Sequence, residues 1–136
     1  MFDTFSFKTE PGTQMVNISA QVQEIVARSG VQEGICVVVL PHTTAGLTVN
    51  SYLDPMTPAD LVSESDRIVP TRVNFHHQAD SPTDASGHVK ASLFGNSQSF
   101  IVSGGKLLLG HSQAILFCEF DGPRQRSVHV RVLRDA

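Results

Sequence analysis

The feature that most constrains the fold is a series of short, β-branched apolar runs, each ended by glycine, proline or polar residues. Residues 35–40 form a continuous run that Pro41 ends, which is typical of a buried strand. Residues 114–120 form a second apolar run, and in residues 127–132 valines alternate with polar residues, as in a strand with one buried face. These patterns predict a mainly β chain with antiparallel strands.

Further strands are predicted on both sides of these runs. Residues 4–8 and 47–53 read as strands, and residues 73–77 as a short one. Residues 100–103 and 106–109 flank Gly104-Gly105, which predicts a two-residue hairpin turn.

Two or three helices are expected between the strands. Ile18, Val22, Ile25 and Val26 share one helical face, and Gly30 can end that helix. Thr57-Pro58 predicts a helix start, with Thr57 as the cap and the helix running to about residue 68. Residues 78–86 are predicted to form a polar loop, after which Ser86 caps a short helix that ends at Gly95. The expected fold is α+β: one antiparallel β-sandwich domain over residues 1–136.

Composition narrows the classes of function. The 136 residues carry a net charge of -3, whereas general nucleic-acid and membrane binders are usually basic. The first residues show neither a basic segment nor an apolar core of a signal peptide, so we expect a soluble, cytoplasmic protein. Cys36 and Cys118 lie in apolar runs and are expected to be reduced, buried core residues.

Histidines are the residues most suited to carry chemistry. His42 follows a buried strand, His77 precedes the polar loop, and His88 follows that loop. Imidazoles from separate elements can hold a divalent metal such as zinc while leaving a position open for water or substrate. Asp60 or Asp84 can then orient a ligand or act as a base. The alternative is that these histidines contact loop backbone or solvent, because their spacing matches no compact metal motif.

A second group of residues favours anion binding. Thr43 and Thr44 offer hydroxyl groups and backbone N–H groups beside Gly46, and Arg124 and Arg126 offer guanidinium groups that suit phosphate. The alternative is that the two arginines are solvated or pair with Asp121 or Glu119.

Motifs along nearly the whole chain resemble those of one family. The matching segments, in order, are His42-Thr43-Thr44-Ala45, Leu47-Thr48-Val49-Asn50, Asp54-Pro55 with Asp60, His77 with Asp84, His88-Val89-Lys90-Ala91-Ser92, Gly95-Asn96-Ser97, Gly105-Lys106-Leu107, Leu109-Gly110 with Gln113, and residues 119–126. In this set the chain resembles the YjbQ family, whose members are often called secondary thiamine-phosphate synthases.

The resemblance implies a fold, an assembly and an activity. The fold is a jelly-roll β-sandwich, the assembly a homotrimer, and the pocket a site near a subunit boundary where His42, His77 and His88 hold a metal ion such as zinc. The activity joins a hydroxymethylpyrimidine diphosphate to a thiazole phosphate and releases pyrophosphate. A small phosphorylated metabolite is therefore the expected partner. Catalytic roles fall to Asp60, Asp84 and Arg124, and substrate binding to Thr43, Thr44, Asn50, Gln113 and Arg126.

The sequence also departs from the family pattern. Ser51 follows Asn50 where the family commonly has Glu, and His111-Ser112 replaces a Thr-Trp pair. The chain contains no tryptophan, so no aromatic platform for a flat heterocycle is expected at that position. Three functions therefore stay open: the metal-assisted transferase, a metal-dependent hydrolase of a small phosphate or ester, and a non-enzymatic trimeric metal- or metabolite-binding protein.

Overall fold

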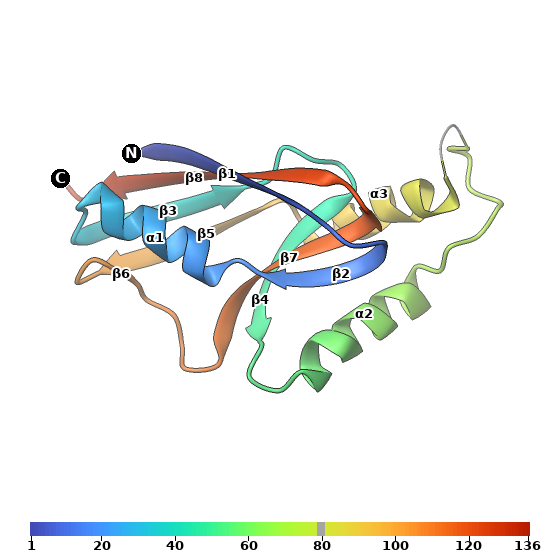
Figure 1. The fold of residues 1–136 in the computed structure, drawn as a ribbon, viewed down its shortest axis with the longest axis horizontal. Coiled ribbons are helices and arrows are strands. Elements are labelled where there is room, and N and C mark those ends of the chain that lie inside the picture. Colours follow the sequence, from blue (N-terminus) through green and yellow to red (C-terminus); the bar gives the residue numbers. More distant parts are fainter. Residues whose placement is uncertain (79–80) are drawn as a thin grey trace.

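The computed structural model describes residues 1–78 and 81–136 (Figure 1). Within these residues the chain forms eight strands and three helices. In chain order they are β1 (Phe2–Lys8), β2 (Gly12–Asn17), α1 (Ser19–Ser29), β3 (Glu33–Val39), β4 (Ala45–Ser51), α2 (Met56–Ile68), α3 (Pro82–Phe94), β5 (Ser97–Ser103), β6 (Lys106–Leu107), β7 (Gln113–Gly122) and β8 (Gln125–Arg134).

The strands form two antiparallel sheets. One sheet has five strands in the order β1-β8-β3-β5-β6, and the other has three in the order β2-β7-β4. The predicted β-rich α+β fold with helical connections is confirmed. The finer assignment as a jelly-roll sandwich stays a prediction.

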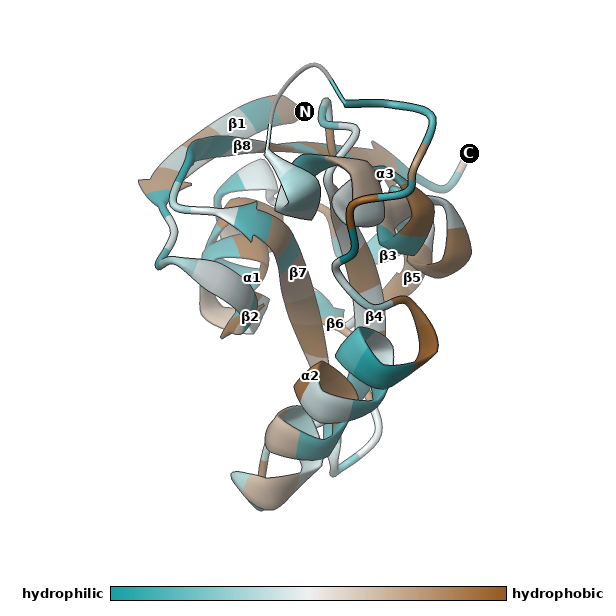
Figure 2. Cartoon of the chain, turned by 90° about the vertical axis from the view of Figure 1, so that its right-hand side faces the viewer, coloured by the Kyte–Doolittle hydropathy of each residue, from teal (hydrophilic) through white to brown (hydrophobic). Residues whose placement is uncertain are grey.

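The main core lies between the two sheets and α1. Val22, Ile25 and Val26 of α1 are buried there, as the helical spacing predicts. β7 is buried along almost its whole length and appears brown in the middle of Figure 2. Its two faces contact different cores, which explains why its sequence is a continuous apolar run rather than an alternating one.

A smaller core lies on the other face of the three-stranded sheet. Met15, Cys118 and Phe120 are buried there under apolar residues of α2 and α3. A Cβ on Gly46 of β4 would lie 2.8 Å from the Phe94 Cβ, so only glycine lets α3 approach so closely. α3 is therefore held against the sheet along its length, with its N-terminal end near the β7–β8 turn.

The local predictions differ from the structure at four places. β2 was not predicted, and residues 73–77 form no strand. α2 has Pro55 rather than Thr57 at its cap position, with the Asp54 carboxylate accepting from the Met56 N–H. α3 begins at Pro82, so part of the predicted loop is helix; residues 79 and 80 of that loop lie outside the described residues. No helix in the described part of the chain has the length and apolar character needed to cross a bilayer.

The two cysteines are free and buried, as predicted. Burial raises the pKa of Cys36 to about 11 and that of Cys118 to about 12. The reactive thiolate is therefore absent near neutral pH. We expect neither cysteine to react with a thiol reagent in the native protein, and both to react in guanidinium. Rapid labelling of either thiol in native protein, followed by mass spectrometry, would contradict this placement.

Candidate functional site

His77, Asp84 and His88 form a cluster of potential metal ligands beside the N-terminal half of α3. One ligand atom from each residue lies within 4.8 Å of the other two. The Nε2 atom of His77 lies 2.6 Å from Oδ2 of Asp84, and the Nε2 atom of His88 lies 3.3 Å from the same oxygen. The two imidazole rings meet edge to face, with centroids 5.1 Å apart. We call these three residues the His–Asp cluster.

The start of α3 explains why two of these residues meet. Ser81 caps the helix, and its side chain accepts from the Asp84 N–H, while Pro82 occupies the first turn. Because the helix begins there, Asp84 and His88 are four residues apart on one helix face. His77 reaches them from the segment before the helix. The structure therefore selects His77 rather than His76 for contact with Asp84.

The donor set of the cluster suits a divalent metal. Two imidazole nitrogens and one carboxylate oxygen match the ligands of catalytic zinc sites and of two-histidine, one-carboxylate iron sites. Asp84 is buried, whereas the side chains of His77 and His88 are 45% and 41% exposed. The buried carboxylate faces two accessible imidazoles, so a metal ion and a further ligand could reach the cluster from solvent.

The charge state of Asp84 also fits metal binding. Burial alone would raise the pKa of Asp84, but the hydrogen bond from His77 and the charges of His88 and His77 outweigh burial and lower it. The carboxylate is therefore ionised at neutral pH, as a ligand must be.

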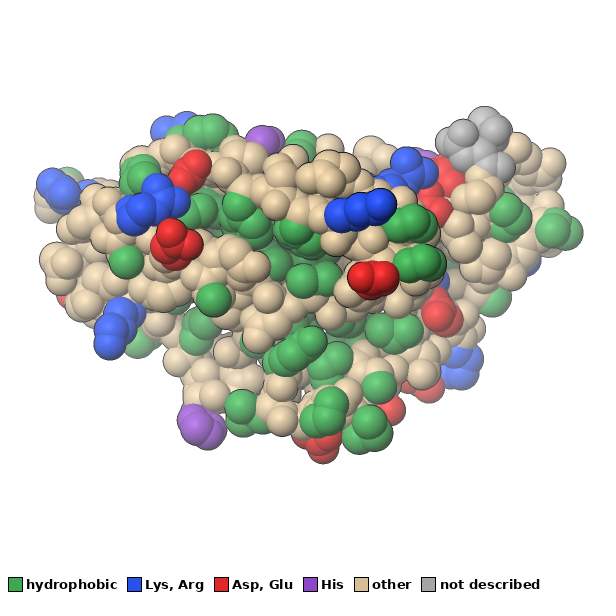
Figure 3. Space-filling view, viewed as in Figure 1, with side chains coloured by type: hydrophobic (Ala, Val, Ile, Leu, Met, Phe, Trp, Pro, Cys, Tyr) green, Lys and Arg blue, Asp and Glu red, His purple; other side chains and the backbone are tan. Residues whose placement is uncertain are grey.

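Arg124 adds a positive charge beside the cluster. Its Nη2 atom lies 2.6 Å from Oδ2 of Asp121 and 3.8 Å from Oδ1 of Asp84. Asp121 also accepts a hydrogen bond from the Thr83 hydroxyl at 2.5 Å. The buried Asp121 carboxylate therefore holds the first turn of α3, through Thr83, next to the Arg124 side chain. The Arg124 side chain stays 45% exposed, so its guanidinium can contact a ligand. Figure 3 shows acidic and basic side chains close together at this end of the molecule.

Arg126 lies in a different environment, below the surface. It pairs with Glu119, which is 0% exposed, and donates to the Thr44 hydroxyl at 2.9 Å. The Thr9 hydroxyl donates to the same glutamate at 2.6 Å. Thr9 and Thr44 lie on the connections β1–β2 and β3–β4, each of which passes from one sheet to the other. Glu119 lies on β7 and Arg126 on β8, so the pair also joins the two sheets. The alternative pairing of the arginines with Asp121 and Glu119 is thus what the structure shows.

Glu119 makes the stability of the fold sensitive to acid. Burial would raise the pKa of Glu119, but hydrogen bonds from Arg126, Thr9 and the Asp121 N–H lower it below its ordinary value of 4.5. Because the unfolded chain then takes up the proton first, the stabilisation is complete above pH 4.5 and is lost as the pH falls through the folded-state value. We expect the urea midpoint to fall steeply below that pH, and less steeply in Glu119→Gln. Parallel pH profiles for the two proteins would contradict the assignment.

His42 lies apart from the His–Asp cluster but shares a cavity with His88. The cavity measures about 510 Å³ and is lined by His42, Thr43, Ala45, His88, Ala91, Ser92, Gly95 and Asn96. Burial and then the charge of Arg126 lower the pKa of His42, so the ring is neutral at pH 7.

The backbone of Ser127 fixes the His42 ring. The Ser127 N–H donates to Nε2 of His42 at 2.9 Å, and the Ser127 carbonyl lies 3.1 Å from the same atom. When Nε2 accepts from the Ser127 N–H, the proton of the neutral ring lies on Nδ1, which can then donate to a ligand in the cavity. Only the other tautomer, in which Nε2 donates to the Ser127 carbonyl, leaves Nδ1 free to bind a metal. The predicted metal-binding role of His42 stays a prediction.

The remaining predicted residues are spread over the molecule. Asn50 and Gln113 lie at the end of the β4–β7 pair opposite Ala45 and Glu119, and each accepts a backbone N–H of a nearby residue. Asp60 is exposed on α2 and is not part of the His–Asp cluster. Their substrate and catalytic roles stay predictions. Sequence reasoning did not identify Asp121 as the residue that fixes the site, although it lies in the matched motif.

The sequence of the chain matches the model of a known protein family. The model of the UPF0047, YjbQ-like proteins matches residues 3–135. The chain belongs to the YjbQ-like UPF0047 family. A UPF0047 protein of Methanocaldococcus jannaschii is 38% identical over 135 residues, covering 99% of this chain and 96% of the relative. The UPF0047 protein YugU of Bacillus subtilis is 35% identical and covers 98% and 99%.

Solved structures of similar proteins share this architecture. A protein of Aeropyrum pernix is 33% identical, with a TM-score of 0.92 and 99% of both chains covered. A YbjQ-like protein of Sulfolobus solfataricus is 29% identical, with a TM-score of 0.93, covering 99% of this chain and 97% of that one. The family membership and the fold of the chain therefore agree.

Proposed function

We propose that this chain is a metal-dependent transferase with thiamine-phosphate-synthase-like activity. It would join a hydroxymethylpyrimidine diphosphate to a thiazole phosphate and release pyrophosphate. The observation that carries the proposal is the His–Asp cluster with the exposed edge of Arg124 beside it. The family resemblance supplies the substrates.

The roles of the residues follow from their geometry. His77, Asp84 and His88 would hold a divalent metal such as zinc, which when bound neutralises negative charge on phosphate oxygens. The bond between the pyrimidine methylene carbon and the diphosphate oxygen breaks, and pyrophosphate leaves with the electron pair while the thiazole nitrogen bonds to that carbon. Arg124 would bind the departing pyrophosphate, whose charge grows as the bond breaks.

The neighbouring cavity can hold the rest of the substrate. The side chains that line it beside the two histidines are hydroxyl, amide and methyl groups, with no carboxylate among them. A neutral heterocycle suits this lining, and Thr43, Ser92 and Asn96 offer hydrogen bonds to it. Positioning the two reactants supplies much of the rate in such a reaction.

We further propose a homotrimer. Large apolar side chains such as Leu53, Met56 and Val73 are exposed, which a single folded chain does not need. Figure 3 shows apolar side chains at the surface along the lower edge of this face, where α2 lies. Light scattering after gel filtration tests the assembly, and a monomeric mass would contradict it.

A metal-dependent hydrolase is the second candidate. The donor set of the His–Asp cluster is also one that activates a bound water. Pyrophosphate release should be measured with purified protein, with and without thiazole phosphate. Pyrophosphate release that requires thiazole phosphate supports the transferase. Release of pyrophosphate or phosphate at the same rate without thiazole phosphate supports the hydrolase. If the protein binds metal stoichiometrically but turns over neither substrate, the non-enzymatic binding function is supported.

A further inference from the structure

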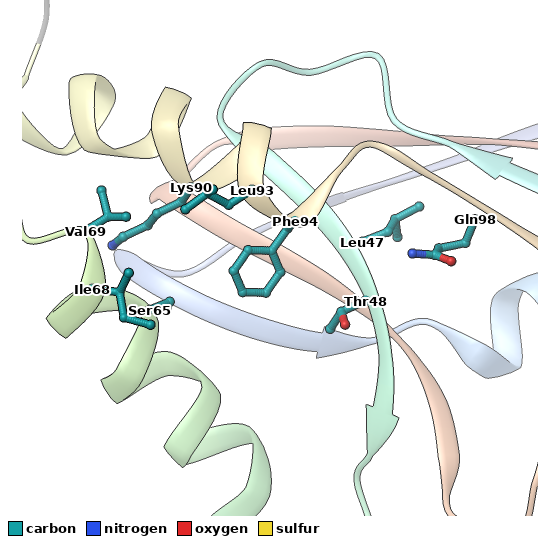
Figure 4. Close-up of a pocket in the computed structure, with 9 residues that line it drawn as sticks. All are labelled: Leu47, Thr48, Ser65, Ile68, Val69, Lys90, Leu93, Phe94 and Gln98. Carbon is teal, nitrogen blue, oxygen red and sulfur yellow. The ribbon is translucent and has the colours of Figure 1, made fainter.

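A second pocket lies on another side of α3, between that helix, the end of α2 and β4 (Figure 4). It has a volume of about 330 Å³ and is lined by Leu47, Thr48, Ser65, Ile68, Val69, Lys90, Leu93, Phe94 and Gln98. None of these residues belongs to the His–Asp cluster or lines the cavity of His42 and His88. The pocket is therefore a separate feature of the molecule.

Lys90 distinguishes this pocket from an ordinary apolar groove. It is the single Lys or Arg among the lining residues, no acidic residue lines the pocket, and Lys90 is 2% exposed. Lys90 follows His88 by two positions, which turns its side chain by about 200° around the helix axis. Figure 4 shows this side chain running to the end of the pocket formed by Ile68 and Val69, with Phe94 in the middle and Thr48 and Gln98 at the far end.

The partner of Lys90 lies outside the pocket. Its Nζ atom donates to Oδ1 of Asp66, a carboxylate whose side chain is 51% exposed and which also accepts from the Thr13 hydroxyl. An ammonium group has three donors. Within the described residues, Asp66 is the hydrogen-bond acceptor that Nζ contacts. Nζ also lies 5.8 Å from the centre of the Phe120 ring, which contributes a cation–π contact but accepts no conventional hydrogen bond. A buried ammonium is costly unless its donors are used, so the donors that Asp66 does not engage favour an anion in the pocket.

We propose that this pocket binds a small carboxylic acid with an apolar or aromatic body. The carboxylate pairs with Lys90, and the body lies against Phe94, Leu93 and Leu47. Lys90 already pairs with Asp66, so a bound carboxylate shares the ammonium with that residue, and a phosphate dianion requires more donors than this lining offers. The volume is at the lower end of the range for small-molecule sites.

Methyl NMR of the intact protein tests the proposal, with phenylacetate, 4-methylpentanoate and indole-3-acetate as probes. At least one acid is expected to give saturable shifts at Leu47, Val69 and Leu93 at millimolar concentration. The matching amide, which has the same shape without the charge, is expected to bind at least about tenfold more weakly. A chelator should leave binding unchanged, because the pocket shares no residue with the His–Asp cluster.

Two variants locate the site. Lys90→Met is expected to remove the preference for acid over amide. Leu93→Trp fills the pocket from a position that is 66% exposed, so it should fold normally and abolish binding of the acid. Leu108→Trp is the matched control, because Leu108 is 63% exposed and does not line this pocket.

Four outcomes would overturn the proposal. They are equal binding of acid and amide, unchanged binding in Leu93→Trp, shifts confined to the methyl groups of Ala45 and Ala91 in the cavity of His42 and His88, and the absence of saturable shifts with all three acids. The last outcome would mean that Lys90 and Asp66 only brace α2 against α3, or that a second copy of the chain covers the pocket.

Discussion

Replacement of Arg126 by Met is expected to lower the free energy of unfolding by about 3–5 kcal/mol, because it leaves the Glu119 carboxylate buried without its partner. Glu119 is 0% exposed and Arg126 is 3% exposed, so water cannot replace the lost contact. The pair also joins β7 of one sheet to β8 of the other, and the Thr44 hydroxyl and carbonyl bind the same guanidinium. Urea denaturation monitored by circular dichroism measures the loss.

A matched control separates this effect from the loss of any arginine. Arg67 pairs with Glu64 on the exposed side of α2, three residues away. Arg67→Met is expected to change stability little, because exposed pairs are screened by water. A second comparison is the double variant Glu119→Leu with Arg126→Met, which should be more stable than Arg126→Met alone, since it removes both buried charges. Equal losses in Arg126→Met and Arg67→Met would show that the buried pair is not the source of the stability.

Replacement of Asp84 by Asn is expected to weaken binding of zinc more than about 100-fold, because even the loss of an outer-shell partner costs 10–100-fold. The amide keeps the size of the side chain but loses the charge that faces both imidazoles. Competition with a chromophoric chelator measures the affinity. His77→Ala and His88→Ala should weaken binding as well, while His111→Ala, which replaces an exposed histidine outside the cluster, should not.

The same titration examines His42. A loss in His42→Ala as large as that in Asp84→Asn would show that His42 completes the ligand set through the cavity it shares with His88. Unchanged affinity in Asp84→Asn, with the helix content intact, would rule out the cluster as a metal site.

The sequence patterns predicted the body of the fold well and the site less well. Alternation and β-branched runs located β3, β7 and β8, and the Gly104-Gly105 hairpin is confirmed, with both glycines at positive φ. These patterns depend on neighbouring residues along the chain, and tertiary packing does not change the elements that they specify. β2 was missed because its residues do not alternate strongly; pairing with β7 makes it a strand.

The composition of the His–Asp cluster depended on where a helix begins. Ser81-Pro82-Thr83-Asp84 is a capping pattern, but residues 78–86 were predicted to be a loop. If Asp84 lies in a loop, its position four residues before His88 does not predict that the two side chains are close. If Asp84 lies on the helix, the same spacing puts both side chains on one helix face. The contact of His77 with Asp84 depends on the path of the preceding segment, which no local pattern specifies.

The burial of β7 has a consequence for motion. It is paired on both edges and covered on both faces, so exposing its amides to exchange with solvent deuterium requires the whole domain to open. α2, by contrast, buries only Ser65 fully. Among the strands and helices, amide protection from hydrogen exchange should therefore be highest in β7 and lowest in α2. The end of α2 that lines the Lys90 pocket can then open locally while the sheets that support the histidines remain folded.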